Sequence, residues 1–359
     1  MGLWQLGGQI RPTGGSNDET ARSDAGSVRS ARHHCLGPAA QLVRGPQPGP
    51  ELPNLAAITN PDVVNAWGLD ASATSPWWIA DNGTDLSTVH TPTGAALGLR
   101  PTVAGGPTGL VANTTTASFP VNGARASFLF SSEDGVIRAW RGGMTEAGVV
   151  ADRSGVDAIY KGLAIAANPD RLYATDFHNA RVDVFDGSFN LVSAPGAFTD
   201  PDLPSGFAPF GIQNAGGTII VTFAKQDEEA EDEVQGQGLG VVDAFDPAGN
   251  FLGRIGTRGQ LNAPWGIAQA RADFGRFSGD LLIGNFGDGE ITAFGRDEDG
   301  DWGPRGQLRG SDHRPIAVDG LWALEFGHGA PNNGPVNTLF FTAGPNDEQD
   351  GLFGSITAD

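Results

Sequence analysis

The sequence predicts an all-β fold, a six-bladed β-propeller, and three observations support this prediction. First, glycine and proline supply 54 and 24 of the 359 residues, which suits short strands joined by tight turns better than long helices. Second, a short apolar strand with glycine or alanine in its middle recurs six times. Third, the middle positions of these copies are separated by 41, 53, 49, 55 and 57 residues, a spacing typical of propeller blades.

Each copy predicts one blade of four strands. The first strands are expected at residues 67–69, 108–110, 161–163, 210–212, 265–267 and 322–324. Second apolar strands follow at residues 77–80, 128–131, 172–175, 219–223, 281–284 and 339–342. Third strands alternate with period two, most clearly at residues 135–140, 181–186 and 240–246, and hairpin turns lead to fourth strands at residues 190–192 and 251–255.

The sixth copy ends at residues 352–357 and lacks a fourth strand. A strand predicted at residues 41–44 can supply it, so that an N-terminal strand completes the last blade. Closure of this kind removes the sheet edges that an open array would expose. We expect the glycines to let neighbouring inner strands approach closely, and the aromatic side chains to fill the wedge between blades.

Residues 1–38 differ from the remainder of the chain. They are rich in Arg, Ser, Gly and Asp and hold too few apolar residues to form a core, so we predict a disordered leader. Residues 39–359 are expected to form a single propeller domain. The leader has no apolar stretch typical of a secretory signal, and it contains the only cysteine, Cys35, so no intramolecular disulfide is expected.

The chain is strongly acidic, with a formal net charge of −20 and a pI near 4.5. Binding of nucleic acid needs basic faces, so we expect no nucleic-acid partner. No apolar run approaches the ~18 residues that cross a bilayer, so no membrane span is predicted. We expect a monomer.

Seven strings along the chain carry a resemblance to a known family. They are NAWG at 65–68, ADNGT at 80–84, YKGLA at 160–164, APWG at 263–266, NFGDG at 285–289, DGLW at 319–322 and FTAGPNDE at 341–348. Together they resemble conserved bacterial propeller proteins of unassigned function, many of which are predicted to be exported. The chain is more distantly similar to NHL-repeat and gluconolactonase-like six-bladed propellers. The resemblance implies an extracytoplasmic or secreted protein.

Candidate binding residues gather where the connections enter the first strands and leave the second strands. In a propeller these connections share one face around the central channel, where binding sites are commonly built. The predicted ligand-binding residues at this channel mouth are Asn65, Asp81, Asn82, Glu133, Lys161, Asp176, Lys225, Asn285, Asp319 and Asn346.

Three of these residues, Asp81, Asp176 and Asn285, are also predicted to hold a divalent cation such as Ca²⁺. Carboxylate and amide oxygens are the ligands that hard cations prefer. The competing interpretation is structural, because Asp, Asn and Gly at strand ends are what tight turns require. None of the metal-ligand motifs of gluconolactonase-like propellers matches residue by residue.

Lys161 and Lys225 are the only lysines of the chain, and both fall at blade positions that face the channel mouth. A flexible ammonium there can bind an anionic substrate or stabilise an oxyanion. Residues 227–233 form a dense acidic run, which we expect to be a solvated, mobile loop. The aspartates at residues 297–301 depart from the calcium-loop pattern, so a hairpin turn is expected there.

Two functional classes follow. The favoured one is a ligand- or partner-binding module that uses the channel-mouth loops to hold a small molecule, a carbohydrate or a protein. The alternative is a divalent-metal-assisted hydrolase or lyase of the gluconolactonase or NHL type. Binding is favoured because the face consists of turn-type residues and no acid–base pair stands out. No nucleophile elbow or phosphate loop is present.

Overall fold

The computed structural model describes residues 40–44 and 58–358. The chain divides into two compact units, 1–33 and 34–359, and all described residues belong to the second. The predicted leader and Cys35 lie outside the described residues. Among the described residues, no helix is long and apolar enough to cross a bilayer.

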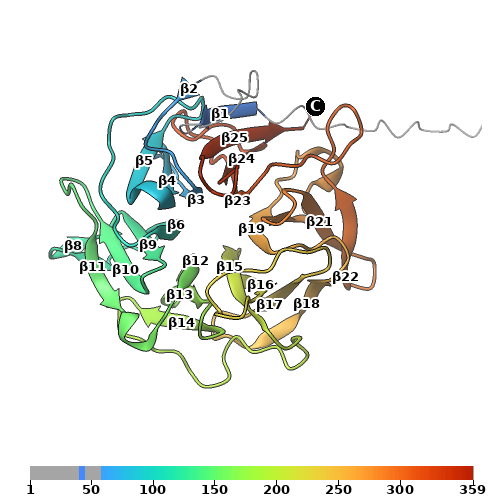
Figure 1. Ribbon diagram of the computed structural model, residues 1–359, viewed down its shortest axis with the longest axis horizontal. Coiled ribbons are helices and arrows are strands. Elements are labelled where there is room, and N and C mark those ends of the chain that lie inside the picture. The colour runs from blue at the N-terminus through green and yellow to red at the C-terminus, as the bar shows by residue number, and fades with distance from the viewer. Residues whose placement is uncertain (1–39, 45–57, 359) are drawn as a thin grey trace, which may run out of the picture. The chain divides into compact units, whose positions relative to one another are not determined.

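The prediction of a six-bladed β-propeller is confirmed, since six antiparallel sheets surround a common axis (Figure 1). Blades 1 to 3 contain, in order, β3 (Ala66–Asp70), β4 (Trp77–Asp81) and β5 (Leu86–His90); β6 (Pro107–Ala112), β9 (Phe128–Ser132), β10 (Val136–Trp140) and β11 (Gly148–Asp152); and β12 (Tyr160–Ala167), β13 (Asp170–Asp176) and β14 (Arg181–Asp186).

Blades 4 to 6 contain β15 (Phe207–Ala215), β16 (Thr218–Lys225), β17 (Gly240–Phe245) and β18 (Phe251–Thr257); β19 (Pro264–Gln269), β20 (Leu281–Asn285), β21 (Ile291–Arg296) and β22 (Trp302–Gln307); and β23 (Leu321–Phe326), β24 (Thr338–Ala343), β25 (Leu352–Thr357), β1 (Ala40–Arg44) and β2 (Ile58–Thr59). The remaining elements are the hairpin β7 (Pro120–Val121) and β8 (Ala124–Arg125) and the short helices η1 (Asn82–Thr84), η2 (Ser154–Val156) and η3 (Gly275–Phe277).

Two blades have fewer than the expected four strands, and blade 6 has a fifth, β2. The segment 190–192, predicted as a fourth strand of blade 3, makes only a single bridge, between Phe185 and Leu191. Blade 1 likewise has isolated bridges to Thr102 and Ala96 in place of a fourth strand. In blade 1 the reason is local, because Pro92 and Pro101 interrupt the segment and proline cannot donate a ladder hydrogen bond.

The predicted closure by an N-terminal strand is also confirmed. Strand β1 pairs antiparallel with β25, with Ala40 opposite Ser355 and Arg44 opposite Leu352 (Figure 1). Threonine hydroxyls also connect neighbouring blades. Thr342 of blade 6 donates a hydrogen bond to the carbonyl of Trp67 in blade 1. In the same way, Thr175 of blade 3 donates to the carbonyl of Phe210 in blade 4 at 2.7 Å.

The six inner strands surround the axis (Figure 1). Five of them carry glycine at the middle position, because the next blade leaves no room for a side chain. At Gly211, an added Cβ would lie 2.1 Å from the carbonyl oxygen of Trp265. The next residue of each inner strand is aliphatic, and the six side chains together form a ring around the axis. They line a cavity of only about 40 Å³ and are Leu69, Leu110, Leu163, Ile212, Ile267 and Leu324. The ring almost closes the channel.

Candidate functional site

The side of the propeller where the first strands begin and the second strands end is called here the Lys161 face. Lys161, the second residue of β12, is only 1% exposed at its side chain. Its Nζ donates to Glu133 Oε1 at 2.7 Å and to Asp232 Oδ1 at 2.9 Å, and it lies 5.3 Å from the ring centre of Trp67. Burial alone would lower the pKa of Lys161, but Glu133 and Asp232 outweigh it and raise the pKa above its ordinary value. The ammonium therefore stays charged.

A chain of hydrogen bonds continues from Glu133 around the channel mouth. Asn82 donates to Glu133 Oε2 at 3.0 Å, and Asn65 donates both to Asn82 Oδ1 at 3.2 Å and to Glu348 Oε2. Together with Lys161 and Asp232, these residues come from blades 6, 1, 2, 3 and 4. The structure therefore joins four of the predicted site residues, Asn65, Asn82, Glu133 and Lys161, into one network, called here the mouth network.

An aromatic layer lies beneath the mouth network. Trp67 and Trp322 stack with ring centres 3.6 Å apart, and Phe286 stacks on Trp322 at 4.0 Å. Trp265 meets Trp67 edge-on and donates through Nε1 to the carbonyl of Lys161 at 3.1 Å. Trp322 Nε1 donates to Asn65 Oδ1 at 2.9 Å and so ties the two layers together. A ligand on this face is consequently held at the mouth and not inside the channel.

The acidic run at residues 227–233 forms a hairpin whose two ends pair, while Glu228, Glu229, Glu231 and Asp232 are exposed to solvent as expected. Gln226 bridges to Glu233, and the amide of Val234 donates to the carbonyl of Lys225 at 2.7 Å. This pairing brings Asp232 onto Lys161. Burial raises the pKa of Glu233 to about 8, although the ammonium of Lys161 lowers it in part.

The raised pKa of Glu233 predicts how stability depends on pH. The folded protein binds this proton more tightly than the unfolded chain, so the stabilisation is complete below the unfolded pKa of about 4.5 and is lost as the pH rises through about 8. We expect the melting temperature to fall between pH 6 and pH 9, with about 2 kcal/mol attributable to Glu233. Thermal melts of the wild type and of Glu233→Gln measure this, and equal slopes for both proteins would contradict it.

The three predicted metal ligands end the second strands of different blades, and each is bound within its own blade. Asp81 Oδ2 accepts from the amide of Thr88 at 2.8 Å, and Asp176 pairs with Arg181 at 2.9 Å. Asn285 donates to the carbonyl of Gln260 at 2.6 Å and to Asp288 at 3.0 Å. No group of three or more His, Cys, Asp or Glu side chains that could hold a metal ion occurs within residues 58–358. A Ca²⁺ site at Asp81, Asp176 and Asn285 therefore stays a prediction without a ligand cluster.

The other predicted residues lie around the mouth network without joining it. Lys225 ends β16, is partly buried and makes no ion pair with any described residue. Asp319 Oδ2 accepts from the amide of Asn346 at 3.0 Å. Asn346, Asp347 and Glu348 all have positive φ, of 60°, 50° and 64°. A run of three such residues in a loop is strained and is common at binding sites.

A cavity of about 400 Å³ opens beside the mouth network. It is lined by Gln235, Phe286, Gly287, Asp288, Ala317, Asp319, Gly320, Gly344, Asp347 and Glu348. Four of these residues are carboxylates and none is basic. Glu348 was not among the residues predicted at this face, although it belongs to the string FTAGPNDE.

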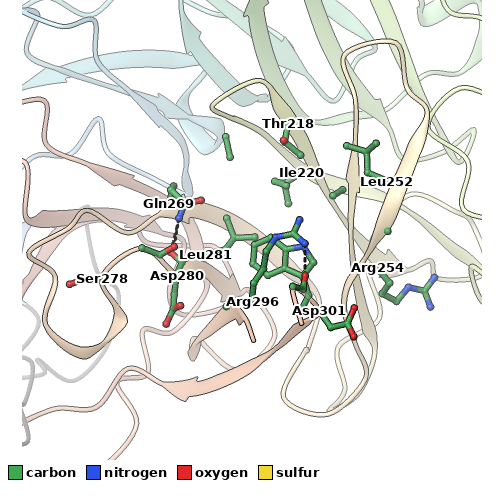
Figure 2. A pocket seen from close by; sticks show the side chains of 17 residues that line it. Thr218, Ile220, Leu252, Arg254, Gln269, Ser278, Asp280, Leu281, Arg296 and Asp301 are labelled. Carbon is green, nitrogen blue, oxygen red and sulfur yellow. Dashed lines mark hydrogen bonds between the residues drawn. The ribbon is translucent and has the colours of Figure 1, made fainter. Parts of the chain in front are cut away.

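A second cavity, of about 770 Å³, lies between blades 4 and 5 (Figure 2). Figure 2 shows Leu252 and Arg254 on one side and Arg296 near Asp301 in the middle. Both arginines are engaged within the protein: Arg254 pairs with Asp243 at 3.0 Å, and Arg296 stacks on Trp302 at 4.6 Å. The cavity thus offers no unpaired basic group, and we assign it no function.

Two relatives match this chain along most of its length, and both are uncharacterised proteins. The uncharacterised proteins R648 and L690 of Acanthamoeba polyphaga mimivirus are 33% and 31% identical over 85% of this chain, covering 78% and 83% of their own lengths. No family model matches. These relatives are viral, so the expected bacterial and exported character stays a prediction.

Solved structures show the same architecture at low sequence identity. A catalytically inactive virginiamycin B lyase from Staphylococcus aureus, solved with quinupristin, aligns with a TM-score of 0.51 and 14% identity over 91% of this chain and 96% of the lyase. A Bacteroides thetaiotaomicron protein of unknown function aligns with a TM-score of 0.53 and 11% identity over 89% of this chain and 76% of that protein. At such identities the likeness establishes the fold alone.

Proposed function

The chain belongs to the same family as the uncharacterised proteins R648 and L690 of Acanthamoeba polyphaga mimivirus, and we propose that it is a binding module. Its channel-mouth loops on the Lys161 face hold a cationic group, carried by a small molecule or by a protein partner. The single observation that supports this proposal is the composition of the cavity of about 400 Å³, with four carboxylates and no base.

The cavity has the chemistry that an organic cation requires. Asp288, Asp319, Asp347 and Glu348 provide negative charge on its walls, and Phe286 provides an aromatic surface that attracts a cation. The formal charge of −20 for the whole chain adds a field that draws cations toward the protein. A compact ammonium or guanidinium group is therefore favoured over a carboxylate or a phosphate.

Lys161 does not oppose this proposal. Its ammonium is enclosed and already paired with Glu133 and Asp232, so its charge is neutralised before any ligand arrives. For the same reason we do not propose Lys161 as the binding group for an anionic substrate. Its contacts instead support a positioning role, since it pairs both with Asp232 in the hairpin of residues 227–233 and with Glu133 in blade 2.

Isothermal titration with matched pairs of ligands tests the proposal. The probes are the amides of Nα-acetyl-lysine and Nα-acetyl-arginine, and their neutral counterparts are the amides of Nα-acetyl-norleucine and Nα-acetyl-citrulline. We expect the charged probes to bind and the neutral ones to bind at least about tenfold more weakly, a difference of about 1.4 kcal/mol. Added salt should weaken the binding of the charged probes.

Variants locate the binding. Asp319→Asn combined with Asp347→Asn removes two carboxylates from the cavity wall and should weaken binding of the charged probes about tenfold. Asp299→Asn, an exposed substitution in the β21–β22 hairpin, is the matched control and should bind as the wild type does. Equal binding of charged and neutral probes, or unchanged binding by the double variant, would overturn the proposal.

The alternative of a divalent-metal-assisted hydrolase or lyase is tested by the same preparation. A stoichiometric amount of metal in the purified protein, together with turnover of lactones or esters, would support this alternative. Because the described residues offer no ligand cluster, the binding module is the function that the geometry favours.

A further inference from the structure

The opposite side of the propeller, where the first strands end, carries a larger cavity and is called here the His328 face. The cavity has a volume of about 1050 Å³. Blades 1, 2, 5 and 6 contribute its lining, which consists of Asp70, Ala71, Ser72, Ala73, Asn113, Thr114, Arg271, Ala272, Asp273, His328 and Val336. The aliphatic ring and the aromatic layer separate it from the Lys161 face. The two cavities are therefore independent sites.

The floor of this cavity is a carboxylate at the narrow part of the channel. Asp70 lines both the large cavity and the constriction of about 40 Å³ above it. Its Oδ1 accepts from the amide of Ala71 at 2.6 Å and its Oδ2 accepts from the amide of Ala112, in blade 2, at 2.7 Å. Two backbone amides thus fix the carboxylate and leave its remaining lone pairs for a ligand. Burial raises the pKa of Asp70 to about 7.

His328 is held in the wall by contacts at both ring nitrogens. Its Nδ1 lies 3.2 Å from the carbonyl oxygen of Ser72, which can only accept, so this nitrogen carries a proton. Its Nε2 lies 3.6 Å from Glu325 Oε1, and Glu325 raises the pKa of His328 above its ordinary value. Glu325 is held in turn by Gln213, which reaches from blade 4 and donates to Oε2 at 3.1 Å.

The lining presents charges of both signs that the protein does not pair. Arg271 and Asp273 lie in the loop after β19, are exposed, and form no ion pair or side-chain hydrogen bond within the described part of the chain. A carboxylate ligand alone would meet Asp70 and Asp273, and an ammonium ligand alone would meet Arg271. A ligand of a single charge therefore faces repulsion, whereas a ligand with both charges can pair with each.

We propose that the cavity of the His328 face is a second binding site, which takes a zwitterionic ligand, an amino acid or short peptide with free amino and carboxyl termini. Arg271 receives the carboxylate, since a guanidinium can hold it through two parallel hydrogen bonds. Asp70 and Asp273 receive the ammonium. The volume of about 1050 Å³ is at the upper end of that of ordinary small-molecule sites and is sufficient for several residues.

Titration with a dipeptide and its blocked forms tests this inference. The probes are alanyl-alanine, its N-acetylated form and its C-amidated form, followed by calorimetry. We expect the free dipeptide to bind and each blocked form to bind at least about tenfold more weakly, because one of its two charges is missing. Equal binding of all three forms, or no binding of the free dipeptide at millimolar concentration, would overturn the inference.

Substitutions at exposed positions show where the dipeptide binds without disturbing the fold. Arg271→Gln and Asp273→Asn should each weaken binding about tenfold, whereas Arg314→Gln, whose side chain is 86% exposed and does not line the cavity, should leave it unchanged. If Arg271→Gln binds the dipeptide as the wild type does, the inference fails.

The double variant of the Lys161 face, Asp319→Asn with Asp347→Asn, separates this inference from the proposed function. It should retain dipeptide binding while its binding of Nα-acetyl-lysine amide weakens about tenfold. Loss of dipeptide binding in that variant would place the dipeptide on the Lys161 face and contradict a second site. Conversely, failure of Nα-acetyl-lysine amide to bind leaves the His328 face untouched, because the two sites share no residue.

Discussion

Replacing both carboxylates that pair with Lys161, as Glu133→Gln with Asp232→Asn, is expected to lower the free energy of unfolding by about 3–5 kcal/mol. The ammonium is 1% exposed, so once its partners are removed it is a buried charge with no countercharge in contact. Amide groups of similar shape keep the packing but supply no negative charge. The loss therefore measures the electrostatic cost of burying this ammonium.

Urea denaturation of the double variant measures this loss, and a third substitution identifies its cause. Adding Lys161→Met removes the buried charge and retains the length of the side chain over Trp67, so much of the lost stability should return. Glu228→Gln with Glu229→Gln is the matched control, since it alters two exposed residues of the same acidic run and should change stability by less than about 0.5 kcal/mol. A triple variant as unstable as the double variant would contradict the electrostatic explanation.

Gly211→Ala is expected to destabilise the protein by about 3 kcal/mol, because the methyl group has no space. The added Cβ would lie 2.1 Å from the carbonyl oxygen of Trp265 in the next blade and 2.9 Å from Thr222 Oγ1. The nearest atom belongs to the backbone, so relief requires the inner strands β15 and β19 to separate. The effect should reach the aromatic layer, to which Trp265 belongs.

Thermal and urea unfolding of Gly211→Ala, compared with Gly142→Ala, measures the effect. Gly142 has no atom within 4 Å of its added Cβ, so alanine there should be neutral or stabilise by about 0.5 kcal/mol. The tryptophan fluorescence of Gly211→Ala should also change, because Trp265 lies against the altered strand. Equal stability of the two variants would show that the inner strands are not as close as this register requires.

The fold was predictable because its main determinant is local and repeated. Each first strand contains its own glycine or alanine and its own aliphatic residue, so six similar strings reveal six blades. The missing fourth strands of blades 1 and 3 were not predictable from the same pattern. There the outer segment makes only single bridges, and the hydrophobic alternation of the inner strands carries no information on that outcome.

The candidate site was predictable only in part, and the reason is the direction of neighbouring side chains. Asp81 ends β4 and points into its own blade, whereas the next residue, Asn82, joins the mouth network. Likewise Asn285 is bound within blade 5, and the following Phe286 packs in the aromatic layer. The residue after the second strand therefore joins the mouth network in blades 1 and 2, whereas the three predicted metal ligands bond within their own blades.

The contacts between distant blades could not be predicted from spacing at all. Glu348 reaches Asn65, and Asp232 reaches Lys161, across long stretches of sequence that no periodic pattern connects. The charged groups of the His328 face were not predicted, because Arg271, Asp273 and His328 lie in loops beyond the first strands, where the repeat has no pattern. In both cases the ring geometry of the propeller brings the residues together.

The closure of the sixth blade joins two strands that are synthesised far apart in time. Strand β1 is synthesised before the other described strands, and its partner β25 is synthesised after them. Five sheets can form while β1 waits unpaired, and the edge of β25 has no partner until β1 returns to it. Because synthesis proceeds at about 5–20 residues per second, this interval lasts many seconds, and it is the period in which a nascent chain would be most open to edge-to-edge association.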